Sequence, residues 1–157
     1  MGNRSQAARR VEEALHERGF EIEVQELSQS TRTAQEAAEA VGVTVGQIVK
    51  SLVFLAGEEP LLVCASGANR VSLGKLTGLL GRSVRKASPD EVREATGFAI
   101  GGVPPLGHAR SLRTLIDQDL FQYDEIWAAA GTPHAVFRTT PAQLREMTRG
   151  EVVDLKE

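Results

Sequence analysis

Cysteine is almost absent from this sequence, since Cys64 is the only one among 157 residues. A single cysteine cannot form an internal disulfide, so the fold must be stable without one. Cys64 lies inside the apolar run Leu61-Leu62-Val63-Cys64-Ala65, and apolar surroundings raise a thiol pKa rather than lower it. We therefore expect a buried, inert thiol and favour this over a catalytic nucleophile.

Long apolar runs and clusters of metal ligands are also missing. No uncharged stretch reaches the roughly 20 residues that a membrane helix needs, and no apolar run follows the arginines of the first ten residues, as a secretory signal requires. We expect a cytoplasmic protein that does not enter the membrane. The three histidines, His16, His108 and His134, are far apart, and no Cys or His pair has ligand spacing, so the sequence predicts no metal site.

The familiar catalytic motifs fail as well. The segment 67–75 resembles a phosphate-binding loop, but six residues separate its glycines and Leu76 stands where Ser or Thr is required. No Gly-x-Ser-x-Gly elbow is present, and the glycines near residue 101 do not have dinucleotide-binding spacing. Any activity must rest on something other than an activated serine, an activated cysteine or a metal-bound water.

What the sequence does contain is an ordinary globular composition, with 41% hydrophobic and 25% charged residues, and a length typical of a single domain over 1–157. Helices and strands are interspersed without strict alternation. This order predicts a mixed α/β fold, with a mixed sheet or barrel flanked by helices, rather than a doubly wound nucleotide fold. Helices are expected at 5–18, 33–42, 72–81, from 88 and at 140–150; strands are expected at 22–27, 51–56, 61–65, 98–102, 111–116, 125–130 and 135–138.

Charge is unevenly distributed along the chain. The formal net charge is −3, yet residues 60–89 contain no acid. An acid-free basic strip in an acidic chain indicates a local site for a polyanion, with a solvated helix face as the alternative. The strip consists of Arg70, Lys75, Arg82, Arg85 and Lys86.

Three local features could carry chemistry. Lys50 opens the buried strand expected at 51–56, so its ammonium either reaches out to solvent or points into a pocket. The segment 101–108, Gly-Gly-Val-Pro-Pro-Leu-Gly-His, is either a wide turn or a loop whose open glycine N–H groups can hold an oxyanion or a phosphate. Gly131-Thr132-Pro133-His134 is a tight, rigid turn that ends in an imidazole.

Four segments together resemble the bacterial prolyl-tRNA synthetase editing-domain superfamily, which includes the free-standing YbaK-like aminoacyl-tRNA deacylases. The resemblance runs from about residue 20 to 150, with the motifs in the family's order. Those segments are Thr33-Ala34-Gln35-Glu36-Ala37-Ala38, the stretch from Val45 to Phe54, the loop from Gly101 to Gly107, and the turn from Ala130 to His134.

The resemblance implies a compact α/β domain with a barrel-like mixed sheet, and cofactor-free hydrolysis of the ester that joins a wrong amino acid to tRNA. It places Lys50 at the centre of activity, orienting the terminal nucleotide or stabilising developing negative charge. The Gly-x-x-x-Pro loop from Gly101 through Gly102 to Pro105 would hold the end of the substrate, and a ribose hydroxyl of the tRNA would help position water. Ser51 and the turn from Gly131 to His134 would line the amino-acid pocket.

The leading hypothesis is therefore a free-standing hydrolase that acts on the acceptor end of aminoacyl-tRNA, most often tRNA for proline, with the basic strip tracking the acceptor stem. Prolyl-tRNA synthetase is a candidate partner. The alternatives are a non-catalytic tRNA- or synthetase-binding paralogue of the same fold and a small-molecule binding module. The sequence names neither the amino acid removed nor the oligomeric state.

Overall fold

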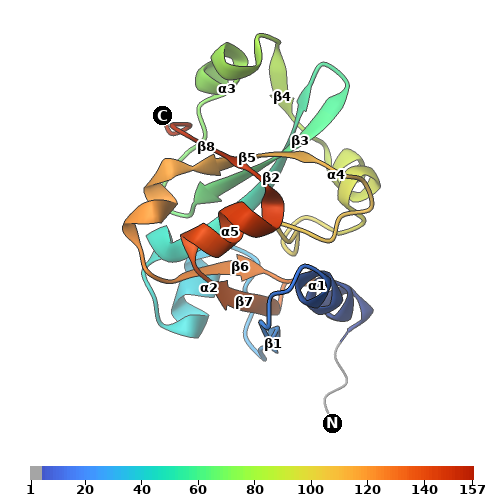
Figure 1. Ribbon diagram of the computed structural model, residues 1–157, viewed down its shortest axis with the longest axis vertical. Helices are drawn as coiled ribbons and strands as arrows, with labels where there is room; N and C mark the ends of the chain where they lie inside the picture. The colour runs from blue at the N-terminus through green and yellow to red at the C-terminus, as the bar shows by residue number, and fades with distance from the viewer. Residues whose placement is uncertain (1–4) are drawn as a thin grey trace.

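A long antiparallel hairpin forms the centre of the molecule, which is described for residues 5–157 by a computed structural model (Figure 1). Its strands are β2 (Ile48–Ala56) and β3 (Glu59–Ser66), paired from Val49↔Ser66 to Ala56↔Glu59. Both strands are rich in apolar residues, and most of their residues are buried. The hairpin expected from the sequence is confirmed and is longer at both ends.

The hairpin lies inside an eight-stranded mixed sheet in this part of the chain, with the order β1-β7-β6-β2-β3-β5-β8 and β4 beside β2. Pairing is parallel for β2 with β6, β3 with β5 and β5 with β8, and antiparallel elsewhere. This confirms the mixed α/β fold. The remaining strands are β1 (Gln25–Glu26), β4 (Val84–Lys86), β5 (Arg113–Asp117), β6 (Ile126–Ala129), β7 (Ala135–Thr139) and β8 (Glu151–Val153).

Helices cover both faces of the sheet. The largest apolar cluster joins α1, α4 and α5 to one face, and α5 is seen in front of the sheet in Figure 1. Two smaller clusters pack α3 and α2 against strand residues such as Phe54 and Ile48. The helices are α1 (Gln6–Glu17), α2 (Ala34–Val41), α3 (Leu73–Leu80), α4 (Pro89–Thr96) and α5 (Pro141–Thr148), with short 3-10 helices η1 (Val45–Gln47) and η2 (Gln118–Gln122).

Local capping chemistry explains where the helices begin. Thr33, Ser88 and Thr140 each accept a hydrogen bond from the backbone N–H three residues later, and the Glu or Gln at that position bonds back to the cap. Gly42, Gly81 and Gly97 end their helices in the left-handed conformation. The expected helix boundaries are confirmed within two residues.

The prediction of a strand at 98–102 is wrong. Phe98 donates its N–H to Thr96 Oγ1, whose own proton is shared between the Val92 carbonyl at 2.8 Å and the Phe98 carbonyl at 3.2 Å, so this backbone is satisfied locally. Gly102 then donates to the Ala99 carbonyl and closes a turn. Phe98 still packs in the main apolar cluster, which explains why the run is apolar without being a strand.

The expected strand at 22–27 shrinks to β1, because the Val24 N–H donates to the Glu12 carboxylate in α1 and not to a strand. The sequence analysis also missed β4, β8 and η2, three short elements that depend on tertiary pairing. These differences leave the fold class unchanged.

The candidate site lies where one edge of β2 has no neighbouring strand. On the edge of β2 away from β3, β6 pairs with residues 48–49 and β4 pairs with residues 54–56, so residues 50–53 have no strand partner there within the described chain. The Ile48 carbonyl accepts from Gly67 on the β3 side, and the Val53 carbonyl accepts from Ala87 on the open side. Because backbone groups alternate in direction, those of Ser51 face the open edge.

Candidate functional site

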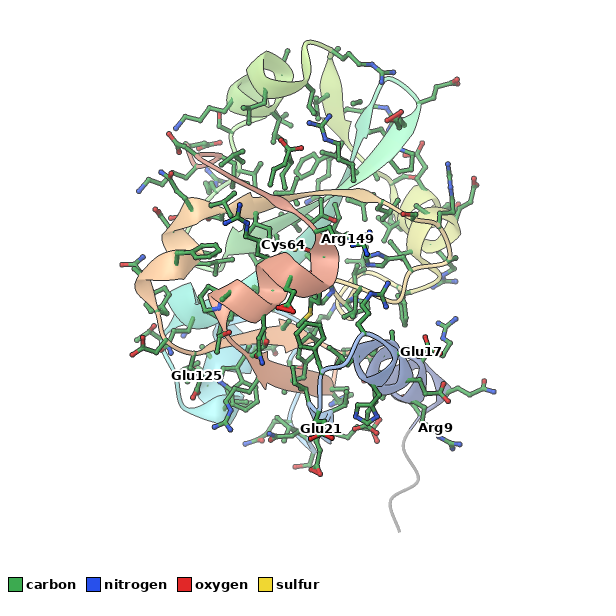
Figure 2. The ribbon with its side chains drawn as sticks, viewed as in Figure 1. Arg9, Glu17, Glu21, Cys64, Glu125 and Arg149 are labelled. Carbon is green, nitrogen blue, oxygen red and sulfur yellow. The ribbon has the colours of Figure 1, made fainter. Side chains whose placement is uncertain are left out.

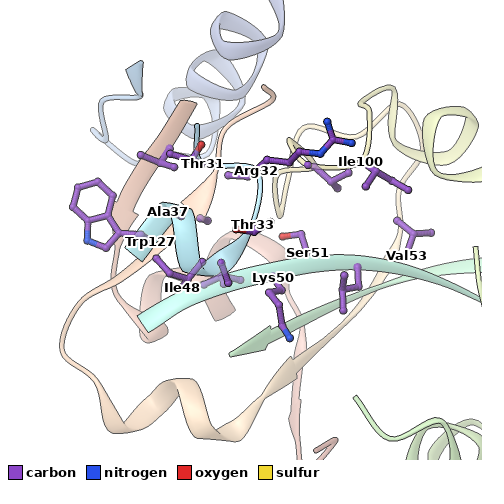
Figure 3. A pocket seen from close by; sticks show the side chains of 18 of the residues that line it. Thr31, Arg32, Thr33, Ala37, Ile48, Lys50, Ser51, Val53, Ile100 and Trp127 are labelled. Atoms are coloured by element: carbon purple, nitrogen blue, oxygen red, sulfur yellow. The ribbon is translucent and has the colours of Figure 1, made fainter. Parts of the chain in front are cut away.

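A cavity of about 410 Å³ lies along this open edge of β2 (Figure 3). Its volume falls within the range of small-molecule sites. The walls come from α2 and the residues before it, β2, the end of β4, α4, the 100–103 loop, β6 and β7. Among the residues singled out from the sequence, the structure brings together here Lys50, Ser51, Lys86 and Gly101.

Lys50 is half-buried, and its side chain leaves β2 on the side opposite Ser51 (Figure 3). Its Nζ donates to the Asn69 carbonyl at 2.6 Å. Burial lowers the pKa of Lys50; the Asp117 carboxylate opposes this effect, and the charges of Arg70 and Lys86 add to it. The ammonium is therefore not free in solvent and has no ion pair among residues 5–157; one carbonyl holds it beside the cavity.

Two hydroxyl groups in the cavity wall are buried without a hydrogen-bond partner in the described chain, those of Thr31 and Ser51. Thr31 is only 5% exposed, and its N–H donates to the Pro133 carbonyl at 2.6 Å. A buried polar group without a partner costs stability, so such groups are uncommon outside functional sites. Together with the open backbone of Ser51, they equip an otherwise apolar cavity for hydrogen bonding.

Cys64 lies opposite Ser51 in the β2–β3 register and inside the molecule (Figure 2). Burial raises its pKa to about 12. A thiol with so high a pKa is protonated at neutral pH and is not a nucleophile. The expectation of a buried thiol with a raised pKa is confirmed.

The lining residues of the cavity include three cations and no carboxylate. These are Arg32, Lys50 and Lys86, and no ion pair is found for any of them among residues 5–157. Arg32 packs its aliphatic stem over Gly101, where a Cβ would lie 2.9 Å from Arg32 Cγ. The edge of the cavity thus favours an anionic ligand group.

Most of the basic strip, in contrast, faces acids that come from outside it. Lys75 pairs with Asp154 at 2.8 Å, and Arg85 pairs with Glu91 at 2.8 Å. The third contact, Arg82 to Glu59, is looser at 3.9 Å. Acids from outside the 60–89 window therefore lie beside three of the five cations of the strip in the folded chain. The sequence could not reveal this, because two of the acids lie outside the acid-free window by a few residues and the third lies in β8's C-terminal extension.

The two glycine motifs meet backbone to backbone. The Gly131 N–H donates to the Gly102 carbonyl at 2.8 Å, and a Cβ on Gly102 would lie 2.7 Å from the Thr132 nitrogen. Gly131 has a φ of 102°, and its own Cβ position is filled by the Ala7 carbonyl at 2.8 Å. Close contact at both glycines joins the 101–105 loop to the 131–134 turn.

Gly102, Pro105, Gly131 and His134 do not line the cavity. Pro105 is buried, whereas His134 is exposed and its Nδ1 lies 3.0 Å from the Gln29 carbonyl. The 131–134 turn instead holds the segment that carries Thr31 and Arg32, through hydrogen bonds from Leu27 and Thr31 to its carbonyls. A direct substrate contact of these four residues stays a prediction.

Reasoning from the sequence missed Thr31, Arg32 and the apolar wall formed by Ile100, Val103 and Trp127. Thr31 and Arg32 directly precede the Thr33 cap, and that position is a signal, because the N-terminus of a helix can bind an anionic group. The sequence contains no signal for the apolar wall, since its residues cannot be distinguished from ordinary core residues by their type.

No group of three or more His, Cys, Asp or Glu side chains is placed to hold a metal ion within residues 5–157. In the same range, no helix is long and apolar enough to cross a membrane.

Comparisons with known proteins agree with this architecture. The model of the aminoacyl-tRNA editing domain family matches residues 28–147. The uncharacterized protein YwhH of Bacillus subtilis is 34% identical over 133 residues, which cover 84% of this chain and 85% of YwhH. EbsC of Enterococcus faecalis, named as a candidate Cys-tRNA(Pro)/Cys-tRNA(Cys) deacylase, is 25% identical over 130 residues, covering 82% and 79% of the two chains.

Among solved structures, one described as a candidate trans-editing enzyme for prolyl-tRNA synthetase superimposes with a TM-score of 0.95. It is 56% identical and covers 99% of both chains. The family match spans most of the sequence and includes Lys50, the Gly101–Pro105 loop and the turn at Gly131. This chain therefore belongs to the aminoacyl-tRNA editing domain family.

Proposed function

We propose that this chain, acting as one domain, is a trans-editing hydrolase that deacylates mischarged aminoacyl-tRNA, with tRNA for proline carrying a small wrong amino acid as the expected substrate. The observation that carries the proposal is the cavity on the open edge of β2, which Lys50, Ser51 and Gly101 line. Residues of two separate motifs, the 45–54 stretch and the 101–107 loop, thus line one concave, partly polar site. The similarity to EbsC and to the trans-editing structure supports the same substrate class.

Hydrolysis of an aminoacyl ester requires few catalytic groups from the protein. Water adds to the carbonyl carbon of the aminoacyl ester, and the ribose oxygen leaves as an alcohol, giving a free amino acid and an uncharged tRNA. Such a step needs orientation of the water and stabilisation of the oxyanion more than a covalent nucleophile. The Lys50 ammonium is the group proposed to meet developing negative charge. The Thr31 and Ser51 hydroxyls and the Ser51 backbone are proposed to bind the aminoacyl group.

The limited selectivity of a synthetase explains why a cell needs a separate editing enzyme. A pocket distinguishes one methylene by only about 1–3 kcal/mol, so a synthetase cannot reject every near-cognate amino acid at the charging step. Hydrolysis after charging supplies the missing accuracy. We expect the protein to work in the cytoplasm, alone or beside prolyl-tRNA synthetase.

The test is a panel of radiolabelled mischarged tRNAs incubated with the wild-type protein. Release of the amino acid supports the hydrolase. Binding without turnover identifies the non-catalytic paralogue, and neither binding nor turnover favours a small-molecule binding module.

For the tRNA backbone, we propose that Lys86 and Arg32, at the cavity, contact phosphates more strongly than the ion-paired part of the strip. Alanine at either position should weaken binding and flatten the dependence of log K on log salt by about 0.7–0.9 per lost contact. Lys75→Ala and Arg85→Ala are the matched controls, because each removes one cation that already has an acid partner. Equal slopes in all four variants would contradict this assignment.

A further inference from the structure

A buried carboxylate lies at the base of the contact that holds Lys50. Asp117 ends β5 and is 1% exposed. Its Oδ2 accepts from the Ser66 N–H at 3.0 Å and from Asn69 Nδ2 at 2.9 Å, and its Oδ1 accepts from the Asp119 N–H at 2.9 Å. Asp117 does not line the cavity and makes no direct ion pair within residues 5–157.

These bonds fix the turn that follows β3. Asn69 donates its N–H to the Ser66 carbonyl at 3.0 Å, and its side chain bridges Asp117 and Asp119. The same residue presents its backbone carbonyl to Lys50 Nζ at 2.6 Å. The place of the ammonium therefore depends on the turn, and the turn depends on Asp117.

The charges around Lys50 also support a role for Asp117. The groups that act on Lys50 come from three surrounding segments: Asp117 from β5, Arg70 from the turn after β3, and Lys86 from β4. Asp117 is the only negative one, and it opposes both the burial of Lys50 and the two neighbouring cations. Without it, the ammonium would sit half-buried among positive charges.

We propose that Asp117 is a positioning residue for Lys50: through Asn69 it fixes the ammonium beside the cavity, and its charge compensates for the burial of that ammonium. Its importance for turnover rests on the proposed function, whereas its effect on Lys50 itself does not. The two parts can therefore be tested separately.

The first experiment measures Lys50 directly. The chain has only four lysines, Lys50, Lys75, Lys86 and Lys156, so ε-¹³C-lysine NMR gives four resolvable side-chain signals, with Lys50→Arg to assign the one that matters. In Asp117→Asn, the Lys50 signal should titrate at a lower pH than in the wild type, because the group that favours the cation is gone. Asp154→Asn is the control, and should move Lys75 but not Lys50. An unchanged Lys50 titration in Asp117→Asn overturns the proposal.

Asn69→Ala separates orientation from charge, and it serves equally if Asp117→Asn does not fold. It removes the bridge to Asp117 but keeps the carboxylate in place. We expect the Lys50 signal to change its chemical shift while its titration stays closer to that of the wild type. No change in the signal would overturn the role of the turn.

The second experiment is a double-mutant cycle on deacylation. Asp117→Asn should lower kcat by between about tenfold and a hundredfold and move the alkaline limb of the pH–rate profile to lower pH. In a Lys50→Ala background, the same substitution should have no further effect. An equal loss in both backgrounds would show a merely structural role and overturn the proposal. If no mischarged tRNA is hydrolysed by the wild type, the proposed function fails, while the NMR titration still decides the role of Asp117.

Discussion

Replacing Gly102 by alanine tests whether the two glycine motifs are held together by close backbone contact. A Cβ there would lie 2.7 Å from the Thr132 nitrogen and 2.8 Å from the Gly131 carbonyl carbon. Both neighbours are backbone atoms, so neither can rotate away. Overpacking of this kind costs about 1–3 kcal/mol, and loss of the Gly131-to-Gly102 hydrogen bond adds about 1 kcal/mol.

We therefore expect Gly102→Ala to lose about 2–4 kcal/mol, which lowers Tm by about 5–15 °C in a domain of this size. The assay is thermal unfolding followed by circular dichroism at pH 7.5. Gly78→Ala is the matched control, because Gly78 lies on exposed α3 with no atom within 4 Å of the added Cβ, and alanine there should raise stability by up to about 1 kcal/mol. A Tm for Gly102→Ala equal to that of the wild type would refute the argument from close contact.

Two further predictions concern the cavity wall and the glycine loop. Thr31→Val removes a buried hydroxyl that has no hydrogen-bond partner in the described chain, so it should raise the free energy of unfolding by about 1 kcal/mol or more. The same substitution should slow deacylation. A stable variant with full activity would contradict a role of this hydroxyl in substrate binding. Burial lowers the pKa of His108, whose Nε2 lies 2.7 Å from the Pro104 carbonyl, so the fold holds the neutral ring. That contribution to stability is complete above about pH 6.5 and is lost as the pH falls, so the Tm advantage of wild type over His108→Gln should shrink from pH 8 to pH 5; a constant difference would contradict it.

Much of the fold could be predicted because local chemistry dictates it. The capping boxes at Thr33, Ser88 and Thr140 mark their helices in the sequence as clearly as in the structure. The apolar runs on either side of Gly57 likewise fix the hairpin. The apolar run that begins at Phe98 led to a wrong strand prediction, because a loop that is anchored by an apolar side chain can have the same composition as a strand.

The candidate site was only partly accessible from the sequence. Lys50 and the Gly101 loop carry family motifs, but the gap in the sheet depends on how far β6 and β4 extend along β2, which no local pattern encodes. The ion pair between Lys75 and Asp154 and the link from Asp117 to Lys50 join residues far apart in the chain. Such long-range contacts set the electrostatics of the site.

The most direct test of the account compares deacylation by wild type and Lys50→Ala on the mischarged tRNA that the wild type hydrolyses fastest. Loss of one oriented charge that stabilises an oxyanion removes roughly 2.7–4 kcal/mol of barrier lowering. We expect the rate of Lys50→Ala to be about a hundred- to a thousandfold lower, with the Tm close to that of the wild type. Lys50→Ala turning over its substrate at the wild-type rate would contradict it.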